Sequence, residues 1–151
     1  SDPEMEYRKS ISSWIDHERL NNKMPEPLKI DVKDNPWQIP SNILDSLQGI
    51  ISINMIHIAP WLCTKSLFKE ASKILKEKKF ILLYGPFKIK DKHTSESNKL
   101  FDKSLKNQNN DWGVRNLENV NEEAMINGFN QEQIIEMPSN NIILIYRKVS
   151  L

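Results

Sequence analysis

The side chains best suited to chemistry in this chain interrupt or follow its most apolar segments. Asn54 and His57 interrupt a run of mostly β-branched residues from Gly49 to Ile58, and burying such polar groups is costly unless they find partners. The pKa of a free histidine lies near neutrality, so His57 could act as a general base. A buried histidine held by a backbone carbonyl explains the same pattern equally well. The sequence therefore leaves both interpretations of His57 open.

A second candidate for catalysis, Tyr84, stands at the end of the next apolar segment. The Gly85-Pro86-Phe87 sequence that follows it predicts a turn. Residues 88–93 then carry three lysines and a histidine against a single aspartate. This basic stretch could favour an acidic substrate. Because lysines are common throughout the chain, a solvated loop is the better supported interpretation.

Several polar and aromatic residues beyond Tyr84 are candidates for binding a substrate. His93-Thr94-Ser95 precedes an expected helix that contains Asn98, and free backbone N–H groups at a helix start can hold an anion. Trp112 and Arg115 could form one wall of a pocket, although an ordinary loop anchor is an equally good interpretation. The candidate substrate-binding residues are Phe87, His93, Asn98, Trp112 and Arg115.

Composition argues against several other kinds of site. The three histidines have no acidic or cysteine partner at ligand-like spacing, so no metal site is expected. The four glycines are far apart, which excludes a glycine-rich phosphate or dinucleotide loop within this chain. A formal net charge of +1 argues against binding to nucleic acid or to a membrane through a polybasic segment.

The single cysteine, Cys63, excludes an internal disulfide framework and makes a reduced, cytoplasmic setting the default expectation. The longest apolar run is too short to span a bilayer, which takes about 20 residues. No membrane association is therefore expected.

The hydrophobic pattern predicts that an α/β scaffold positions these residues. Helices are expected to begin at Asp2, at Pro60, at Thr94 or Ser95 (with Leu100, Phe101 and Leu105 as its apolar residues), and at Asn116 or Asn119, the last ending at Gly128. Strands are expected at residues 28–32, 49–58, 80–84, 133–137 and 142–146, with a loop over residues 34–42.

The order of these elements predicts one domain with a mostly parallel sheet and a C-terminal antiparallel hairpin. In such sheets the ligand crevice lies at the carboxyl ends of the strands. The site should therefore be built from Asp31 and Val32, from residues 54–57 and from residues 84–88.

Four segments together resemble a known family. They are Asn54-Met-Ile-His-Ile-Ala-Pro-Trp61, Leu83-Tyr-Gly-Pro-Phe-Lys88 running to His93-Thr-Ser, Asp111-Trp-Gly-Val-Arg115, and Glu136-Met-Pro-Ser-Asn-Asn141. The chain resembles, over essentially its whole length, the family catalogued as domain of unknown function 938. That family is placed among the class I S-adenosylmethionine-dependent methyltransferases, which implies a Rossmann-like sheet.

The resemblance implies a site for S-adenosylmethionine. Asp2 would accept hydrogen bonds from the ribose hydroxyls, although a helix N-cap explains this residue equally well. Asp31 and the Val32 backbone would meet the adenine, and Asn54, Met55 and Ile56 would lie beside the methionine part. A solvated strand end is the alternative for Asp31. Methyl transfer to a positioned nucleophile requires no metal.

The resemblance also implies that a first strand-helix-strand unit, with its glycine-rich turn, lies upstream of Ser1. The chain is therefore expected to be a fragment, about three quarters of such a domain, and inactive by itself. Loss of that first strand would expose an interior strand edge, which invites pairing or a homo-oligomer.

Two functions remain in competition at this point. The first is an S-adenosylmethionine-dependent methyltransferase that acts on a small molecule or another unidentified acceptor. The second is a non-catalytic binding or scaffold protein of the same fold that has lost the cofactor.

Overall fold

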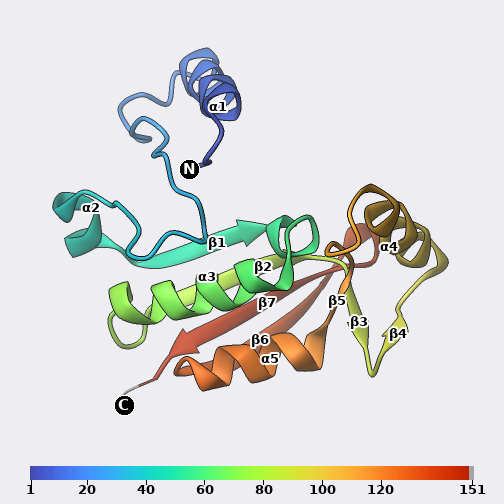
Figure 1. Ribbon diagram of the computed structural model, residues 1–151. Helices are drawn as coiled ribbons and strands as arrows, with labels where there is room; N and C mark the ends of the chain where they lie inside the picture. Colours follow the sequence, from blue (N-terminus) through green and yellow to red (C-terminus); the bar gives the residue numbers. More distant parts are fainter. Residues whose placement is uncertain (150–151) are drawn as a thin grey trace. The chain divides into compact units, whose positions relative to one another are not determined.

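The computed structural model describes residues 1–149, and this part of the chain forms two compact units. The first unit is Ser1–Ser46, and the second begins at Leu47. Figure 1 shows the elements of both.

The first unit contains two helices, α1 (Met5–His17) and α2 (Ser41–Ser46). The predicted helix start at Asp2 is wrong by a few residues, because Glu4 occupies the N-cap position of α1. The Asp2 side chain still lies at this start, where its Oδ1 accepts a hydrogen bond from the Glu4 N–H at 2.8 Å.

The predicted strand over residues 28–32 is also wrong. Residues 28–31 have no regular structure and pair with no strand in the described chain. The Leu28 carbonyl instead accepts a hydrogen bond from the Asp2 backbone at 3.1 Å. The expected loop over residues 34–42 ends where α2 begins, since the Pro40 carbonyl accepts the N–H groups of Ile43 and Leu44.

The second unit is built on a four-stranded sheet in the order β1-β2-β7-β6. These strands are β1 (Gly49–Ile53), β2 (Phe80–Gly85), β6 (Phe129–Met137) and β7 (Asn141–Lys148). Strands β1 and β2 are parallel, whereas β7 is antiparallel to both β2 and β6. The strand predictions for residues 80–84, 133–137 and 142–146 and the hairpin are confirmed. Antiparallel pairing, however, makes up more of this sheet than expected.

The predicted strand over residues 49–58 is too long at its carboxyl end. Strand β1 stops at Ile53 because Asn54 adopts the left-handed conformation, with φ 56° and ψ −11°. A 3₁₀ turn, η1 (Met55–His57), follows directly. Asparagine tolerates this conformation better than most residues, so it can end a strand abruptly.

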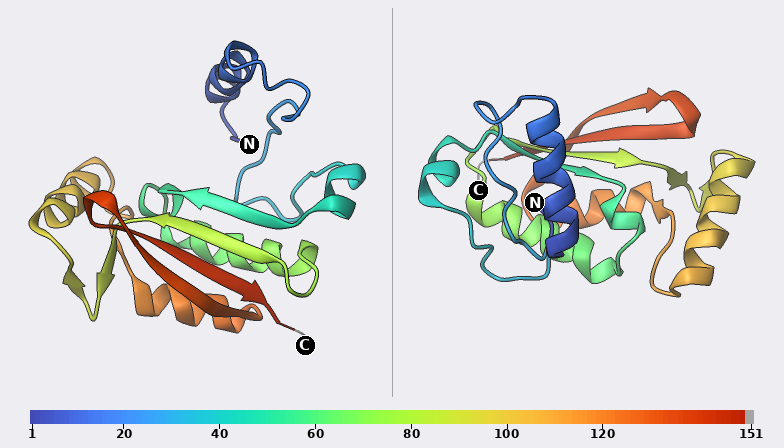
Figure 2. Two further views of the ribbon diagram at one scale, coloured as in Figure 1. Left: turned by 180° about the vertical axis from the view of Figure 1, so that it is seen from behind. Right: turned by 90° about the horizontal axis from the view of Figure 1, so that it is seen from above.

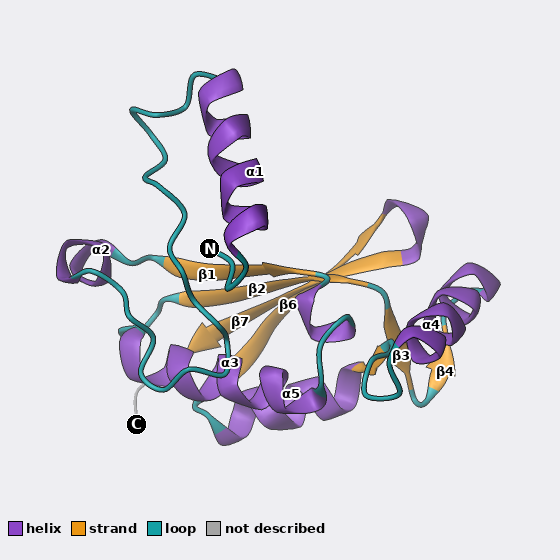
Figure 3. Cartoon of the chain, turned by 45° about the horizontal axis from the view of Figure 1, so that its top comes forward, coloured by secondary structure: helices purple, strands orange, loops and turns teal. Residues whose placement is uncertain are grey.

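Two helices, α3 (Trp61–Ile74) and α5 (Leu117–Ile126), cover one face of this sheet (Figures 1 and 3). Strands β2 and β7 alternate buried and half-buried residues, as expected when one face packs against helices. Phe68 of α3 is fully buried against the rings of Phe129 and Tyr146, at centroid distances of 6.0 and 5.4 Å. These contacts form part of the core between α3 and strands β6 and β7.

Strand β1 lies at the edge of the sheet, and Ile51 and Ile53 on it are each 63% exposed. Whether this edge pairs with a strand upstream of Ser1 stays a prediction.

A second, three-stranded sheet lies beyond the end of β2. It contains β3 (Phe87–Ile89), β4 (Lys92–His93) and β5 (Arg115–Asn116), with helix α4 (Glu96–Gln108) between β4 and β5 (Figure 2). The basic stretch over residues 88–93 is thus a short β-hairpin rather than an irregular loop.

Helix α4 begins as predicted, with the Ser95 side chain accepting the Asn98 N–H at 3.1 Å. Leu105 is buried as predicted, but Asn98 and Asp102 are buried beside it while Leu100 is 61% exposed, so the packed side differs in part from the expected one. Helix α5 also ends as predicted, at Gly128 with φ 77°. A second short 3₁₀ turn, η2 (Pro138–Asn140), closes the β6–β7 hairpin.

Among the described residues, no helix is both long and apolar enough to cross a membrane.

Candidate functional site

Parallel pairing of β1 with β2 places the candidate catalytic segments side by side. Ile53 pairs with Tyr84 at the carboxyl ends of these strands. The Asn54 N–H then donates to the Tyr84 carbonyl at 2.8 Å, which holds the η1 turn beside the end of β2. Tyr84 and the residues from Asn54 to His57 therefore meet at one edge of the sheet, as the sequence predicted.

His57 is completely buried at this edge. Its carbonyl accepts the Gly113 N–H at 2.9 Å, and its Nδ1 lies 3.3 Å from the Arg115 backbone nitrogen, which donates to it. Its ring meets Phe87 edge to face at 5.0 Å. Burial and then the nearby Arg115 charge lower the pKa of His57 from 6.5 to about 3.

These contacts bear on the two interpretations of His57. The Nδ1 lone pair is occupied by the Arg115 N–H, so the proton of the neutral ring is assigned to Nε2. Nε2 has no hydrogen-bond partner among the described residues. The arrangement favours a structural role, with a backbone N–H as the partner in place of the expected carbonyl.

Gly85 leaves the space that the His57 ring fills. A Cβ at Gly85 would lie 2.6 Å from His57 Nε2 and 2.9 Å from Asn54 Oδ1. We expect Gly85→Ala to lower the free energy of unfolding by about 1–3 kcal/mol, because neither the buried His57 ring nor the half-buried Asn54 side chain can move away without disturbing the end of β1. Urea denaturation followed by circular dichroism measures this change.

Gly49→Ala is the matched control for that substitution. Its Cβ would also meet an atom at 2.6 Å, but that atom belongs to the half-buried Phe80 ring at the sheet edge. The ring can turn aside, so we expect a loss below about 1 kcal/mol. Equal losses in the two variants would mean that the His57 environment is not tightly packed.

Arg115 joins the Asp111–Arg115 loop to the η1 turn. Its Nε donates to the Ile56 carbonyl at 2.8 Å, and its Nη2 donates to the carbonyls of Ala59 at 2.5 Å and Asp111 at 2.8 Å. Its guanidinium carbon also lies 5.8 Å from the centre of the Trp61 ring. Arg115 is therefore brought to the same edge of the sheet as Asn54 and His57.

A buried carboxylate that the sequence analysis missed, Asp102 of α4, ties three segments together. Its Oδ1 accepts the Val114 N–H at 2.8 Å, and its Oδ2 lies 2.8 Å from Lys106 Nζ and 3.3 Å from His93 Nε2. The Lys106 and Val114 hydrogen bonds outweigh burial and lower the pKa of Asp102. Nothing in the hydrophobic pattern marks Asp102, because acidic residues usually face solvent.

The remaining substrate-side candidates are dispersed around this carboxylate. Asn98 is buried and donates to Thr94 Oγ1 and to the Asn140 carbonyl, each at 2.9 Å, so its amide joins α4 to the β6–β7 turn. Phe87 is fully buried. Trp112 is half-buried, and its backbone N–H donates to the Asn109 carbonyl. Their predicted role in substrate binding stays a prediction.

Asp2, Asp31 and Val32, three of the predicted cofactor residues, lie in the first unit. The Asp31 carboxylate accepts the Lys33 N–H at 2.9 Å and lies 3.4 Å from Lys33 Nζ. The Val32 carbonyl accepts the Trp37 indole N–H at 3.2 Å. Asp2 Oδ1 caps the Glu4 N–H at the start of α1.

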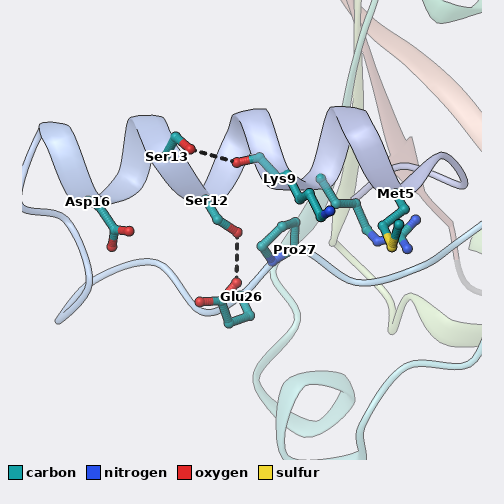
Figure 4. Close-up of a pocket in the computed structure, with 8 residues that line it drawn as sticks. Met5, Lys9, Ser12, Ser13, Asp16, Glu26 and Pro27 are labelled. Atoms are coloured by element: carbon teal, nitrogen blue, oxygen red, sulfur yellow. Dashed lines mark hydrogen bonds between the residues drawn. The ribbon is translucent and has the colours of Figure 1, made fainter.

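Two of the open hollows on the surface of the described chain are lined by none of the predicted cofactor residues. The first, of about 460 Å³, runs along α1 beside Glu26 and Pro27, where Ser12 Oγ donates to Glu26 Oε2 at 2.7 Å (Figure 4). The second, of about 420 Å³, lies along α4 and includes His93 and Asp102. No group of acidic, histidine or cysteine side chains in the described chain could hold a metal ion.

The chain is similar in fold to parts of several larger proteins whose structures are solved. The chain matches the mitomycin 7-O-methyltransferase MmcR with a TM-score of 0.81 and 12% identity, covering 98% of this chain and 41% of that one. It matches LaPhzM with a TM-score of 0.78 and 9% identity, covering 99% of this chain and 42% of that one. Human N-acetylserotonin methyltransferase, solved in complex with SAM, matches with a TM-score of 0.68 and 15% identity, covering 82% of this chain and 33% of that one.

These likenesses establish the fold, and the chain spans less than half of each of these proteins. The family described as "Protein of unknown function (DUF938)" matches residues 1–148, which is nearly the entire chain. The chain therefore belongs to the DUF938 family and has the fold of the class I S-adenosylmethionine-dependent methyltransferases.

Proposed function

We propose that the whole protein to which this chain belongs is an S-adenosylmethionine-dependent methyltransferase acting on a small molecule. The observation that carries the proposal is the match of 98% of this chain to MmcR at a TM-score of 0.81. Two of the similar structures are described as complexes with SAM or SAH, which supports the choice of cofactor.

The residues proposed for the cofactor keep unused hydrogen-bonding groups that suit it. Asp2 uses only Oδ1 within the described chain, so Oδ2 is available to a ribose hydroxyl. The Val32 N–H has no partner among the described residues and can donate to an adenine nitrogen, while the neighbouring Asp31 carboxylate can accept from the adenine amine. We assign Asn54, Met55 and Ile56 to the methionine part.

The cofactor, when bound, supplies the reactive methyl carbon. The residues of this chain position the segments around the reacting groups. In our proposal Arg115 and the Asn54–Tyr84 hydrogen bond hold the η1 turn against the end of β2. His57 keeps that turn in place as a buried neutral ring, and a role as general base is less favoured because its basic nitrogen is occupied.

Tyr84 remains our candidate for the acceptor side of the reaction. It ends β2, and its hydroxyl has no hydrogen-bond partner among the described residues. Alternation along the strand places its side chain on the opposite face from Ile81 and Leu83, which are buried on the α3 and α5 side.

Calorimetric titration of the whole protein with S-adenosylmethionine tests this proposal. We expect saturable binding, and formation of S-adenosylhomocysteine when an acceptor is supplied. Binding without turnover on any acceptor would favour the non-catalytic alternative, and no binding would contradict the proposal.

A further inference from the structure

The Arg115 guanidinium has hydrogen-bonding capacity that this chain does not use. A guanidinium carries five N–H groups. The Ile56, Ala59 and Asp111 carbonyls accept one from Nε and two from Nη2. The two N–H groups of Nη1 therefore have no partner in the described chain.

The positive charge of Arg115 also lacks a direct counter-ion. No carboxylate of the described residues lies within ion-pair distance of it. Asp102 and Asp111 act on it only at longer range, and burial lowers the pKa of Arg115. Asp102 is already engaged by Lys106 and by the Val114 N–H. His57 is neutral at physiological pH, so it adds no second positive charge beside Arg115.

A half-buried cation without a counter-ion is costly unless something else neutralises it. The three carbonyls hold the guanidinium plane rigidly, and the Trp61 ring lies against it at 5.8 Å. The group is thus a fixed cation beside an aromatic ring, which suits a planar anion.

We propose that Arg115 Nη1 binds a carboxylate group of the methyl acceptor, so that the acceptor is an anionic small molecule. This inference rests on the proposed methyltransferase function. The methionine part of the cofactor also carries a carboxylate, and Arg115 Nη1 could bind that group in place of the acceptor's.

Nuclear magnetic resonance of the full chain can test this with benzoate and its uncharged counterpart benzamide. The signals to follow are the Arg115 Nε–H and the Trp61 indole N–H. We expect benzoate to shift both signals saturably and to bind about tenfold more tightly than benzamide, because only benzoate can form a charge-assisted hydrogen bond. Equal responses to benzoate and benzamide would overturn the proposal. This test needs no substituted variant.

Arg115→Lys should weaken benzoate binding about tenfold, since lysine cannot bridge three carbonyls and present a fixed fork. Arg147→Lys is the matched control, because Arg147 also lies over a ring, 5.9 Å from the centre of Phe80, but already pairs with Glu132. Benzoate affinity unchanged by Arg115→Lys, or weakened equally by Arg147→Lys, would contradict the assignment.

Repeating the benzoate titration on the whole protein saturated with S-adenosylhomocysteine separates the two sources of the carboxylate. Benzoate should still bind if Arg115 serves the acceptor, and displacement by S-adenosylhomocysteine would overturn that assignment. The same experiment measures whether S-adenosylhomocysteine binds. A protein that does not bind it would contradict the proposed function, whereas loss of benzoate binding would contradict only the role of Arg115.

Discussion

Replacing Asp102 with alanine is expected to lower the free energy of unfolding by about 3 kcal/mol. The substitution removes the acceptor of the buried Val114 N–H, and an unsatisfied buried donor costs about 1–3 kcal/mol. It also removes the charge that holds Lys106 Nζ at 2.8 Å. A hydrogen bond to a charged group contributes about 1.5–3 kcal/mol, and the bond to Lys106 contributes less because Lys106 is partly exposed. Urea denaturation measures the loss.

Glu96→Ala provides the comparison on the same helix. Glu96 and Lys99 form an ion pair at 3.4 Å with side chains that are 72% and 62% exposed. Exposed pairs contribute roughly 0–1 kcal/mol, so this variant should remain close to the original stability. Asp102→Asn should fall between the two, because the asparagine oxygen can still accept the Val114 N–H. A loss for Asp102→Ala no larger than for Glu96→Ala would show that Asp102 does not hold α4 and the 113–114 segment together.

The second large effect is a dependence of stability on pH that originates at His57. Its pKa is about 3 in the folded chain against 6.5 in the unfolded chain. Between these values the unfolded state binds one more proton than the folded state, so stability must decrease as the pH falls. The slope due to this residue is about 1.4 kcal/mol per pH unit well below pH 6.5.

His57→Asn should remove that slope, since its side-chain oxygen can accept the Arg115 N–H without titrating. The variant will be less stable at neutral pH, but the comparison is between slopes measured from pH 6.5 to 4.5. His17→Asn is the control, because the His17 side chain is 72% exposed. If the original chain and His57→Asn show parallel curves, the histidine is not buried and neutral as described.

The strands that the sequence predicted well are those with a one-sided burial pattern. Phe80 to Tyr84 alternates between the helix-covered face and the opposite face, and β7 does the same. These segments pair with each other, so local pattern and tertiary structure agree. The 138–141 turn between β6 and β7 was also evident, because proline followed by asparagines disfavours continued strand.

The segments predicted poorly depend on partners that a local pattern does not reveal. Residues 28–32 have strand-like composition but pair with no strand in the described chain. The early end of β1 depends on the backbone conformation of a single residue, Asn54. Helix α4 buries Asn98 and Asp102 because their partners, Asn140 and Val114, come from distant segments.

The candidate site was predicted only in part, because some of its contacts also come from distant segments. The rule that sites lie at the carboxyl ends of parallel strands brought Asn54, His57 and Tyr84 together correctly. It could not reveal that Arg115 would clamp η1 through three carbonyls, or that the His57 nitrogen would be occupied. Such contacts follow from the path of the 111–116 segment, and no spacing rule encodes that path.

Binding of S-adenosylmethionine is the most direct test of the central claim that this chain belongs to a methyltransferase. Isothermal titration calorimetry should be performed on the protein encoded by the complete gene and, in parallel, on the chain that begins at Ser1. We predict a dissociation constant of about 10 μM or lower for the complete protein, competition by S-adenosylhomocysteine, and much weaker binding by the shorter chain, which has no glycine-rich turn. Absence of binding by the folded complete protein at millimolar S-adenosylmethionine would contradict the account.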